Sequence, residues 1–320
     1  MEKKLTLGRS SLKVPRMGIG AMVWGQPRGF SRLTPARLSY GPSHGAGEEE
    51  RALEFSLEGG VNLIDTAAMY SNGASEERVG QLIKDKDVVV ATKFPPRILS
   101  RTSDFNQALG ESLARLGRSR VGLYQHHFPS RRVSIPELME LMADAVHDGR
   151  IQAVGVSNYS ARQMRIAHEV LDRHGIPLAS NQVQYSLLYR KPEINGVLDA
   201  CHELGIALIA YMPLASGALT GKYHPGTRPE GVFRRFMAPF SRKGMQRLLP
   251  VISLLDEIGK RYDKTPAQVA LRWLIENPDV IPIPGAKNGK QAAENTGALS
   301  FSLTAEEVDA LSKATLPWRD

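Results

Sequence analysis

The chain has 320 residues, 42% of them hydrophobic, and carries a formal net charge of +8 with a pI near 9.6. Its single cysteine, Cys201, excludes an internal disulfide and a cysteine-rich metal site. No apolar run approaches the roughly 20 residues of a membrane span, and Met1 to Val14 lacks the apolar stretch of a signal peptide, so we expect a globular cytoplasmic protein. Basic residues are scattered among acidic ones, which argues against a nucleic-acid binder.

A short hairpin is expected at the N-terminus. Leu5-Thr6-Leu7 and Leu12-Lys13-Val14 flank the turn Gly8-Arg9-Ser10-Ser11, and we expect this hairpin to plug the floor of a barrel. The segment Gln26 to Gly47 is rich in Gly, Pro, Ser and Arg without periodicity, which predicts a long loop after the first core strand.

Short apolar strands then alternate with amphipathic helices, a pattern typical of a parallel sheet covered by helices. Eight such units favour an α/β fold, a (β/α)8 TIM barrel, as a single domain over residues 1–320. A doubly wound open sheet is the alternative, but the stretch after the first strand lacks the third small residue of a G-x-G-x-x-G phosphate loop. The predicted strands are 17–20, 62–65, 88–93, 122–127, 151–157, 179–182, 207–211 and 280–283, and the predicted helices are 48–57, 75–84, 104–116, 135–147, 161–174, 193–204, 266–276 and 291–296.

Two pieces fall outside this repeat. The long segment Pro213 to Leu248 is assigned to function. A C-terminal extra helix is expected after Thr304, because Thr304 and Glu307 form the sequence pattern of a capping box.

Polar side chains cluster at the ends of three successive strands: Asp65 with Tyr70 close behind it, then Lys93, then the pair His126-His127. Reducing a carbonyl by hydride transfer needs a proton donor, and a phenol with a pKa of about 10 is a reluctant one at neutral pH. An ammonium beside the phenol stabilises the phenolate, and a carboxylate keeps that ammonium charged when it is buried.

These residues lie in the patterns D-T-A-x-x-Y-x-x-G-x-S-E, T-K-F and L-Y-x-x-H-x-P. The sequence thereby resembles the aldo-keto reductases, whose catalytic tetrad is Asp, Tyr, Lys and His. The resemblance implies reduction of aldehyde or ketone carbonyls to alcohols with NADPH, NADH being less favoured, and Tyr70 as the proton donor. It selects His127 to orient the carbonyl oxygen. Because neighbouring side chains on a strand point to opposite faces, His126 is expected to face the helices as a structural histidine.

The same resemblance implies cofactor contacts at the remaining strand ends. Ser157, Asn158 and Gln182 match residues that hold the nicotinamide carboxamide, and Tyr211 matches a ring that stacks on nicotinamide. The usual Y-S-P-L reads Tyr211-Met212-Pro213-Leu214 here, so backbone amides and Ser216 are expected to replace the missing serine at the pyrophosphate. Further cofactor contacts are expected from Gly20, Ala21, Met22, Asp65, Ala215, Gly217, Lys222, Gly285 and, on a lid, Arg234 or Arg235.

Lys287 matches a residue near the ribose 2′-phosphate, where a helix N-terminus adds partial positive charge. Glu294 and Asn295 match residues near the adenine. Gln291 stands where many members have arginine, which weakens the expected preference for NADP. The expected substrate pocket contains Trp24, Tyr70 and His127, with Trp24 replacing a tryptophan often found at the position of Met22.

The expected partner is a small carbonyl compound, with no metal, nucleic acid or membrane, and the sequence is compatible with a monomer. A metal site is not expected because ligands at suitable spacing are lacking. A cofactor-binding regulatory subunit with little turnover is the alternative function, because channel-associated members of the superfamily share the barrel and the tetrad.

Overall fold

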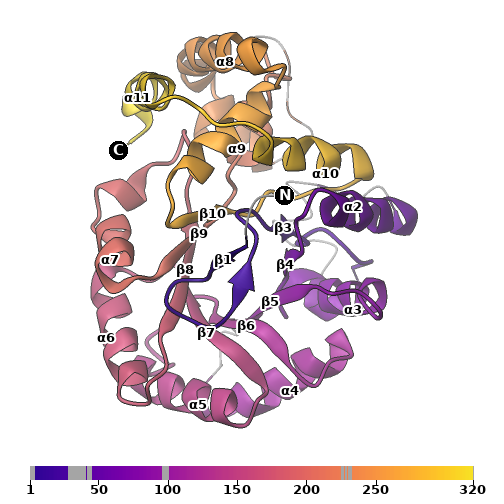
Figure 1. Ribbon diagram of the computed structural model, residues 1–320, viewed down its shortest axis with the longest axis vertical. Helices are drawn as coiled ribbons and strands as arrows, with labels where there is room; N and C mark the ends of the chain where they lie inside the picture. Colours follow the sequence, from indigo (N-terminus) through magenta and orange to yellow (C-terminus); the bar gives the residue numbers. More distant parts are fainter. Residues whose placement is uncertain are drawn as a thin grey trace.

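The computed structural model describes residues 4–27, 41, 45–95, 101–224, 227, 229 and 233–319. Eight parallel strands form a ring that helices surround (Figure 1), so the predicted (β/α)8 barrel is confirmed. Each strand is hydrogen-bonded to the next one in the sequence. The strands are β3 (Ile19–Gly20), β4 (Leu63–Asp65), β5 (Val89–Phe94), β6 (Val121–His126), β7 (Ile151–Ser157), β8 (Leu178–Gln184), β9 (Ala207–Tyr211) and β10 (Val280–Pro282).

The ring closes between its first and last strands. Gly18 N donates to Pro282 O and Gly20 N donates to Pro284 O, each at 3.0 Å. Gly20 also forms a parallel bridge with Gly285. The carboxyl ends of all eight strands therefore open toward one mouth, the position of the active site in barrel enzymes.

Amphipathic helices cover the outside of the ring, and several begin with a side-chain cap. Ser160, Thr265 and Thr304 each form a capping box with the residue three positions on, as predicted for Thr304. The helices are α2 (Ala46–Glu58), α3 (Ala74–Leu82), α4 (Phe105–Leu116), α5 (Ile135–His147), α6 (Ala161–Asp172), α7 (Val197–Leu204), α8 (Arg242–Tyr262), α9 (Pro266–Glu276), α10 (Gly289–Thr296) and the C-terminal extra helix α11 (Ala305–Ala314).

The N-terminal hairpin is present, with β1 (Leu5–Thr6) antiparallel to β2 (Lys13–Val14). It crosses the centre of the ring of strands (Figure 1). Its buried residues Leu7, Leu12 and Val14 pack against side chains of the barrel interior, among them Leu63, Ala91, Leu123 and Ile281. The hairpin thus closes the end of the barrel opposite the mouth.

The sequence missed α8, a helix of 21 residues. Its internal Pro250 lacks a backbone donor and, with its glycines, obscures the helical pattern. Tertiary packing stabilises it, because the apolar residues recur every three or four positions on one buried face: Met245, Leu248, Val251, Leu255 and Ile258. Even so, none of the described helices combines the length and apolar character needed to cross a membrane.

Several other boundaries differ from the prediction, most of them by one or two residues, and two are worth explaining. Helix α7 begins at Val197 rather than at 193, because Gly196 has a left-handed φ of 76° and separates the helix from a short 3-10 turn at Lys191–Glu193. The predicted loop 26–47 ends earlier, since α2 begins at Ala46, and most of that loop lies outside the described residues.

The hairpin turn supplies a stability test. Gly8 has a φ of 54°, and a Cβ there would lie 2.5 Å from Ala179 O. Gly175 has a similar φ of 67° with nothing within 4 Å. Gly175→Ala should cost about 1–2 kcal/mol of unfolding free energy from its left-handed backbone, whereas Gly8→Ala adds an overpacking cost of about 1–3 kcal/mol. Urea denaturation of both variants checks this, and equal losses would contradict the packing of the hairpin.

Candidate active site

The four residues of the predicted tetrad meet at the barrel mouth. Asp65 ends β4, Lys93 lies near the end of β5, and His127 directly follows β6. Tyr70 is not at a strand end; it begins a 3-10 turn, η2 (Tyr70–Gly73), beyond β4. Parallel register places these strand ends side by side, with Asp65 opposite Ala91 and Lys93 opposite Gln125.

Lys93 is the centre of this group and is fully buried. Its Nζ donates to Asp65 Oδ1 at 2.7 Å, to Thr66 O at 2.8 Å and to Tyr70 Oη at 3.4 Å. An ammonium has three hydrogens to donate, so the protein satisfies all of them. The phenol, the ammonium and the carboxylate therefore form one connected chain.

The two adjacent histidines point in opposite directions, as strand alternation predicts. The His127 ring lies edge-on to Tyr70, with ring centroids 5.8 Å apart. His126 faces outward, where its Nδ1 lies 2.6 Å from Tyr159 Oη and its ring contacts Phe94. Among the described residues, His127 Nδ1 is buried without a hydrogen-bond partner.

Burial is the largest single influence on the pKa of each titratable group of the tetrad whose pKa is shifted. It raises the pKa of Tyr70 above 10.0, although the ammonium of Lys93 acts in the opposite direction. For Lys93, burial alone would lower the pKa, but Asp65 and then Tyr70 outweigh it, and the pKa lies above 10.5. Burial, the charge of Lys93 and the neighbouring His126 hold the pKa of His127 well below 6.5. At neutral pH the site therefore contains a protonated phenol, a charged lysine and a neutral imidazole.

Asp65 accepts further hydrogen bonds from two amides inside the barrel. Gln182 Nε2 donates to Asp65 Oδ2 at 2.8 Å and Gln125 Nε2 at 3.5 Å. The sequence analysis missed Gln125, although alternation puts it on the same face as His127, two residues on. Gly155 makes room for it, because a Cβ there would lie 2.8 Å from Gln125 Cγ.

The residues predicted to hold the carboxamide also come together. Asn158 Nδ2 donates to His127 O at 3.2 Å and to Ser157 Oγ at 3.1 Å. Ser157 Oγ donates to Gln182 O at 2.8 Å, and Tyr211 Oη donates to Asn158 Oδ1 at 3.0 Å. This polar cluster is continuous with the tetrad through His127 and through Asp65.

The segment after β9 has an unusual backbone. Met212, Ala215 and Ser216 adopt left-handed φ values of 53°, 47° and 58°. Such non-glycine residues cluster at ligand sites, and successive left-handed turns can aim backbone N–H groups at an anion. Arg234 lies against this segment and donates to Ser216 O at 2.6 Å and to Tyr223 Oη. The other basic side chains predicted here are exposed: Lys222, and Arg235, which donates to Pro229 O.

The predicted adenosine residues lie in the loop that follows β10 and on α10. Lys287 N donates to Gln291 Oε1 at 2.9 Å, and Asn295 Nδ2 donates to Gly285 O at 3.4 Å. Glu294 Oε1 accepts from Oγ1 of Thr265, the N-cap residue of the neighbouring helix α9. The sequence analysis missed Glu48, from α2, whose Oε2 accepts from Gly289 N at the start of α10 at 3.2 Å. Only the packing of α10 beside α2 brings these residues together (Figure 1).

Trp24, which follows the first barrel strand, does not lie where the predicted substrate pocket requires it. Trp24 is fully buried and its Nε1 donates to Ala286 O at 2.7 Å, so the ring packs in the core and offers no surface to a substrate. Ala21 is fully buried too, whereas Gly20 and Met22 are half-buried. Two exposed apolar residues adjoin the tetrad: Met69, directly before Tyr70, and Phe128, directly after His127. The ring of Phe128 stacks on that of His127 with centroids 4.7 Å apart, and the position of Phe128 next to that histidine could have revealed it in the sequence.

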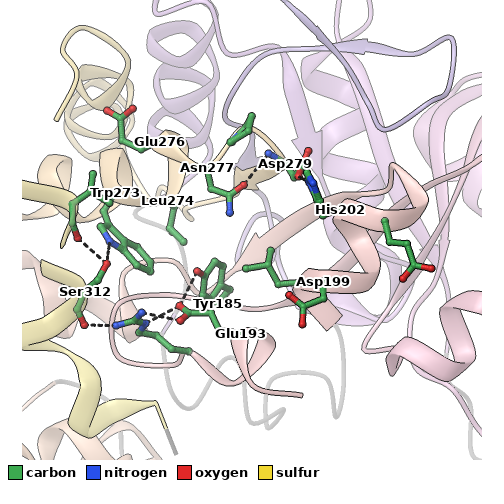
Figure 2. Close-up of a pocket in the computed structure, with 15 residues that line it drawn as sticks. Tyr185, Glu193, Asp199, His202, Trp273, Leu274, Glu276, Asn277, Asp279 and Ser312 are labelled. Carbon is green, nitrogen blue, oxygen red and sulfur yellow. Dashed lines mark hydrogen bonds and ion pairs between the residues drawn. The ribbon is translucent and has the colours of Figure 1, made fainter. Parts of the chain in front are cut away.

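A separate cavity of about 710 Å³ lies outside the barrel between α7, α9 and α11 (Figure 2). None of the tetrad residues lines it. On one wall, Arg190 donates to both carboxylate oxygens of Glu193 at 2.7 Å, lies over the ring of Trp273 and donates to Ser312 O on α11. These contacts fasten the C-terminal helix to the barrel.

Comparison with known proteins agrees with this geometry. The model of the aldo/keto reductase family matches residues 17–315. The chain is 37% identical to the chloroplastic pyridoxal reductase of Arabidopsis thaliana, with 92% of this chain and 82% of that protein covered. It is 33% identical to an NADP(+) aldo-keto reductase of Schizosaccharomyces pombe, with 94% and 88% covered. The solved structure of a glycerol dehydrogenase from Gluconobacter oxydans is similar, with a TM-score of 0.81 at 26% identity over 96% of this chain and 94% of that one.

The fold and the site define an oxidoreductase built on a (β/α)8 barrel. The chain belongs to the aldo/keto reductase family. Members of this family use a nicotinamide cofactor, and the amides, hydroxyls and left-handed backbone at this mouth suit such a group.

The buried ion pair predicts a large effect on stability. Asp65→Asn leaves the ammonium of Lys93 without a counter-charge, so the unfolding free energy at neutral pH should fall by about 3–5 kcal/mol. Asp256→Asn breaks a pair of the same length, 2.7 Å, with the exposed Lys260 and should leave stability nearly unchanged. Urea denaturation at pH 7 compares the two variants, and similar losses would contradict the role of burial.

The same variant should also change how stability depends on pH. In the wild type the pKa of Lys93 is raised by folding. The stability that this charged lysine contributes is therefore present below pH 10.5 and is lost as the pH rises through the folded-state pKa. In Asp65→Asn, burial without a counter-charge lowers that pKa below the unfolded-state value. The unfolded state then binds more protons, and the variant should gain stability relative to the wild type as pH rises from about 7 toward 10.

Proposed function

We propose that the protein reduces aldehydes or ketones to alcohols with NADPH and that Tyr70 supplies the proton. The observation that carries this proposal is the connected chain from Asp65 through Lys93 to Tyr70, beside a neutral His127 at the mouth. A bound nicotinamide cofactor supplies the hydride.

Each tetrad residue at the mouth has its own role in the reduction of the carbonyl. His127 hydrogen-bonds the carbonyl oxygen and orients it, and as a neutral imidazole it adds no competing acid. Tyr70 donates its proton to that oxygen as negative charge develops there. The phenolate that remains would be costly in this buried place, and the ammonium of Lys93 stabilises it because Asp65 keeps the lysine charged and fixed.

Contacts around the mouth support the assignment of the cofactor. Ser157, Asn158 and Gln182 offer amides and hydroxyls to a carboxamide, and Tyr211 offers a ring to the nicotinamide. Lys287 at the start of α10 is our candidate for the 2′-phosphate, consistent with the NADP(+) in the name of the Schizosaccharomyces pombe relative. The substrate panel should include pyridoxal, because one relative is a pyridoxal reductase.

Tyr70→Phe tests the proton donor. Removing the hydroxyl should lower turnover by roughly 10²–10⁴-fold, the usual contribution of a general acid, while the dissociation constant of NADPH changes little. Tyr262→Phe is the matched control, because it removes a hydroxyl on α8 that donates to Glu307 at 2.7 Å and should leave turnover intact. NADPH oxidation is followed across aldehydes, ketones, quinones and pyridoxal. Turnover of Tyr70→Phe near the wild-type level would refute the mechanism.

Lys287→Glu tests the choice of cofactor. One lysine contact to a phosphate is worth about 1–3 kcal/mol, or roughly ten- to hundredfold in affinity. The wild type should therefore bind NADPH more tightly than NADH, added salt should narrow the gap, and Lys287→Glu should remove or reverse it. Lys290→Glu makes the same charge change at an exposed position nearby and should keep the preference. Fluorescence titration gives the dissociation constants of NADPH and NADH for each variant. If Lys287→Glu left the ratio of these two constants unchanged, Arg234 or Arg235 would become the candidate for binding the 2′-phosphate.

A further inference from the structure

A row of buried aromatic rings lies directly behind the barrel mouth. Its members are Phe94, His126 and Tyr159, each about 1% exposed. The ring centroids of Phe94 and His126 are 5.9 Å apart, and those of His126 and Tyr159 are 5.7 Å apart. Each ring adjoins a residue of the mouth in the sequence, so a shift of the row would shift the mouth.

Two hydrogen bonds tie the end of β6 to the segment that follows β7. His126 Nδ1 and Tyr159 Oη lie 2.6 Å apart, and Asn158 Nδ2 donates to the main-chain oxygen of His127 at 3.2 Å. Two adjacent residues of one strand end are thus joined to two adjacent residues of the next. Burial lowers the pKa of His126 to about 4, so the ring is neutral at physiological pH.

The segment after β7 turns sharply at Asn158, whose left-handed φ of 60° is one that asparagine adopts more readily than most non-glycine residues. Tyr159 is held on two sides. Its backbone N donates to Asn181 Oδ1 at 3.4 Å and its carbonyl accepts from Asn181 Nδ2 at 3.0 Å, while its hydroxyl reaches His126.

We propose that Tyr159 and His126 are positioning residues whose hydrogen bond sets the distance between His127 and Asn158. This inference rests on the proposed function, in which His127 orients the carbonyl and Asn158 holds the nicotinamide. Neither positioning residue reaches the mouth, since the alternation of the strand directs His126 away from it. Misplacement by about 1 Å can slow a reaction roughly a hundredfold, so the loss of this bond should affect the rate of hydride transfer more than the binding of the cofactor.

Tyr159→Phe is the first test, because it keeps the ring and removes only the hydroxyl. Tyr185→Phe is the matched control: it also removes a hydroxyl from a buried tyrosine, one that donates to Glu193 at 2.9 Å beside the outer cavity. Single-turnover oxidation of NADPH, the dissociation constant of NADPH and the melting temperature are measured for both. Tyr159→Phe should slow the single-turnover rate roughly tenfold or more with less than about a threefold change in the dissociation constant, and Tyr185→Phe should leave the rate unchanged.

Two variants of His126 separate the hydrogen bond from the packing. His126→Asn keeps a polar group near the position of Nδ1 and should retain most of the rate, whereas His126→Phe should lose as much as Tyr159→Phe. Combining His126→Phe with Tyr159→Phe should cause little further loss, because the two changes remove the same bond.

A lower melting temperature with a normal rate in Tyr159→Phe would overturn the inference, because the pair would then serve only stability. An equal rate loss in Tyr185→Phe would also overturn it. A wild-type protein that oxidises no NADPH with any carbonyl would instead refute the proposed function, and this inference with it.

Discussion

An ammonium removed entirely from water at the mouth of the barrel is the constraint on which the rest of the site depends. Lys93 is tolerable there only because Asp65, the carbonyl of Thr66 and the hydroxyl of Tyr70 accept its three hydrogens. Those acceptors come from β4 and from the chain just beyond it, so the pair is satisfied only when β4 and β5 are in register. Folding of the barrel and assembly of the site are therefore one event.

The alternation of side chains along the strands separates chemistry from support. Inward residues such as Lys93, Gln125 and His127 meet at the mouth, while their outward neighbours pack under the helices. His126 is one of the outward residues that carry a polar group, and its Nδ1 lies 2.6 Å from Tyr159 Oη. The polar residues inside the barrel are joined in turn, because Asp65 also receives the amide of Gln182, three strands beyond Lys93.

The sequence by itself specified the barrel, because eight apolar runs alternating with amphipathic helices leave few other ways to bury the sheet. Strand parity allowed only one of the two adjacent histidines to turn inward, and the family motif selected His127. The motifs around Asp65, Tyr70 and Lys93 placed three of the tetrad residues in order. Local signals of this kind can be read from the sequence because they depend on only a few neighbouring residues. They failed for α8, where Pro250 interrupts the pattern and long-range packing restores the helix.

Only the tertiary structure decided which side chains share an environment. The sequence analysis expected Trp24 in the substrate pocket, but its indole donates to the carbonyl of Ala286, far along the chain, and the ring is buried in the core. Glu48 reaches the start of α10 only because α2 and α10 pack together at the closure of the ring. The pKa of Tyr70 lies above its usual value because burial outweighs the nearby ammonium. Each of these outcomes depends on contacts between residues that are distant in the sequence and on the exclusion of solvent by those contacts. A local sequence pattern encodes neither the contacts nor the exclusion of solvent.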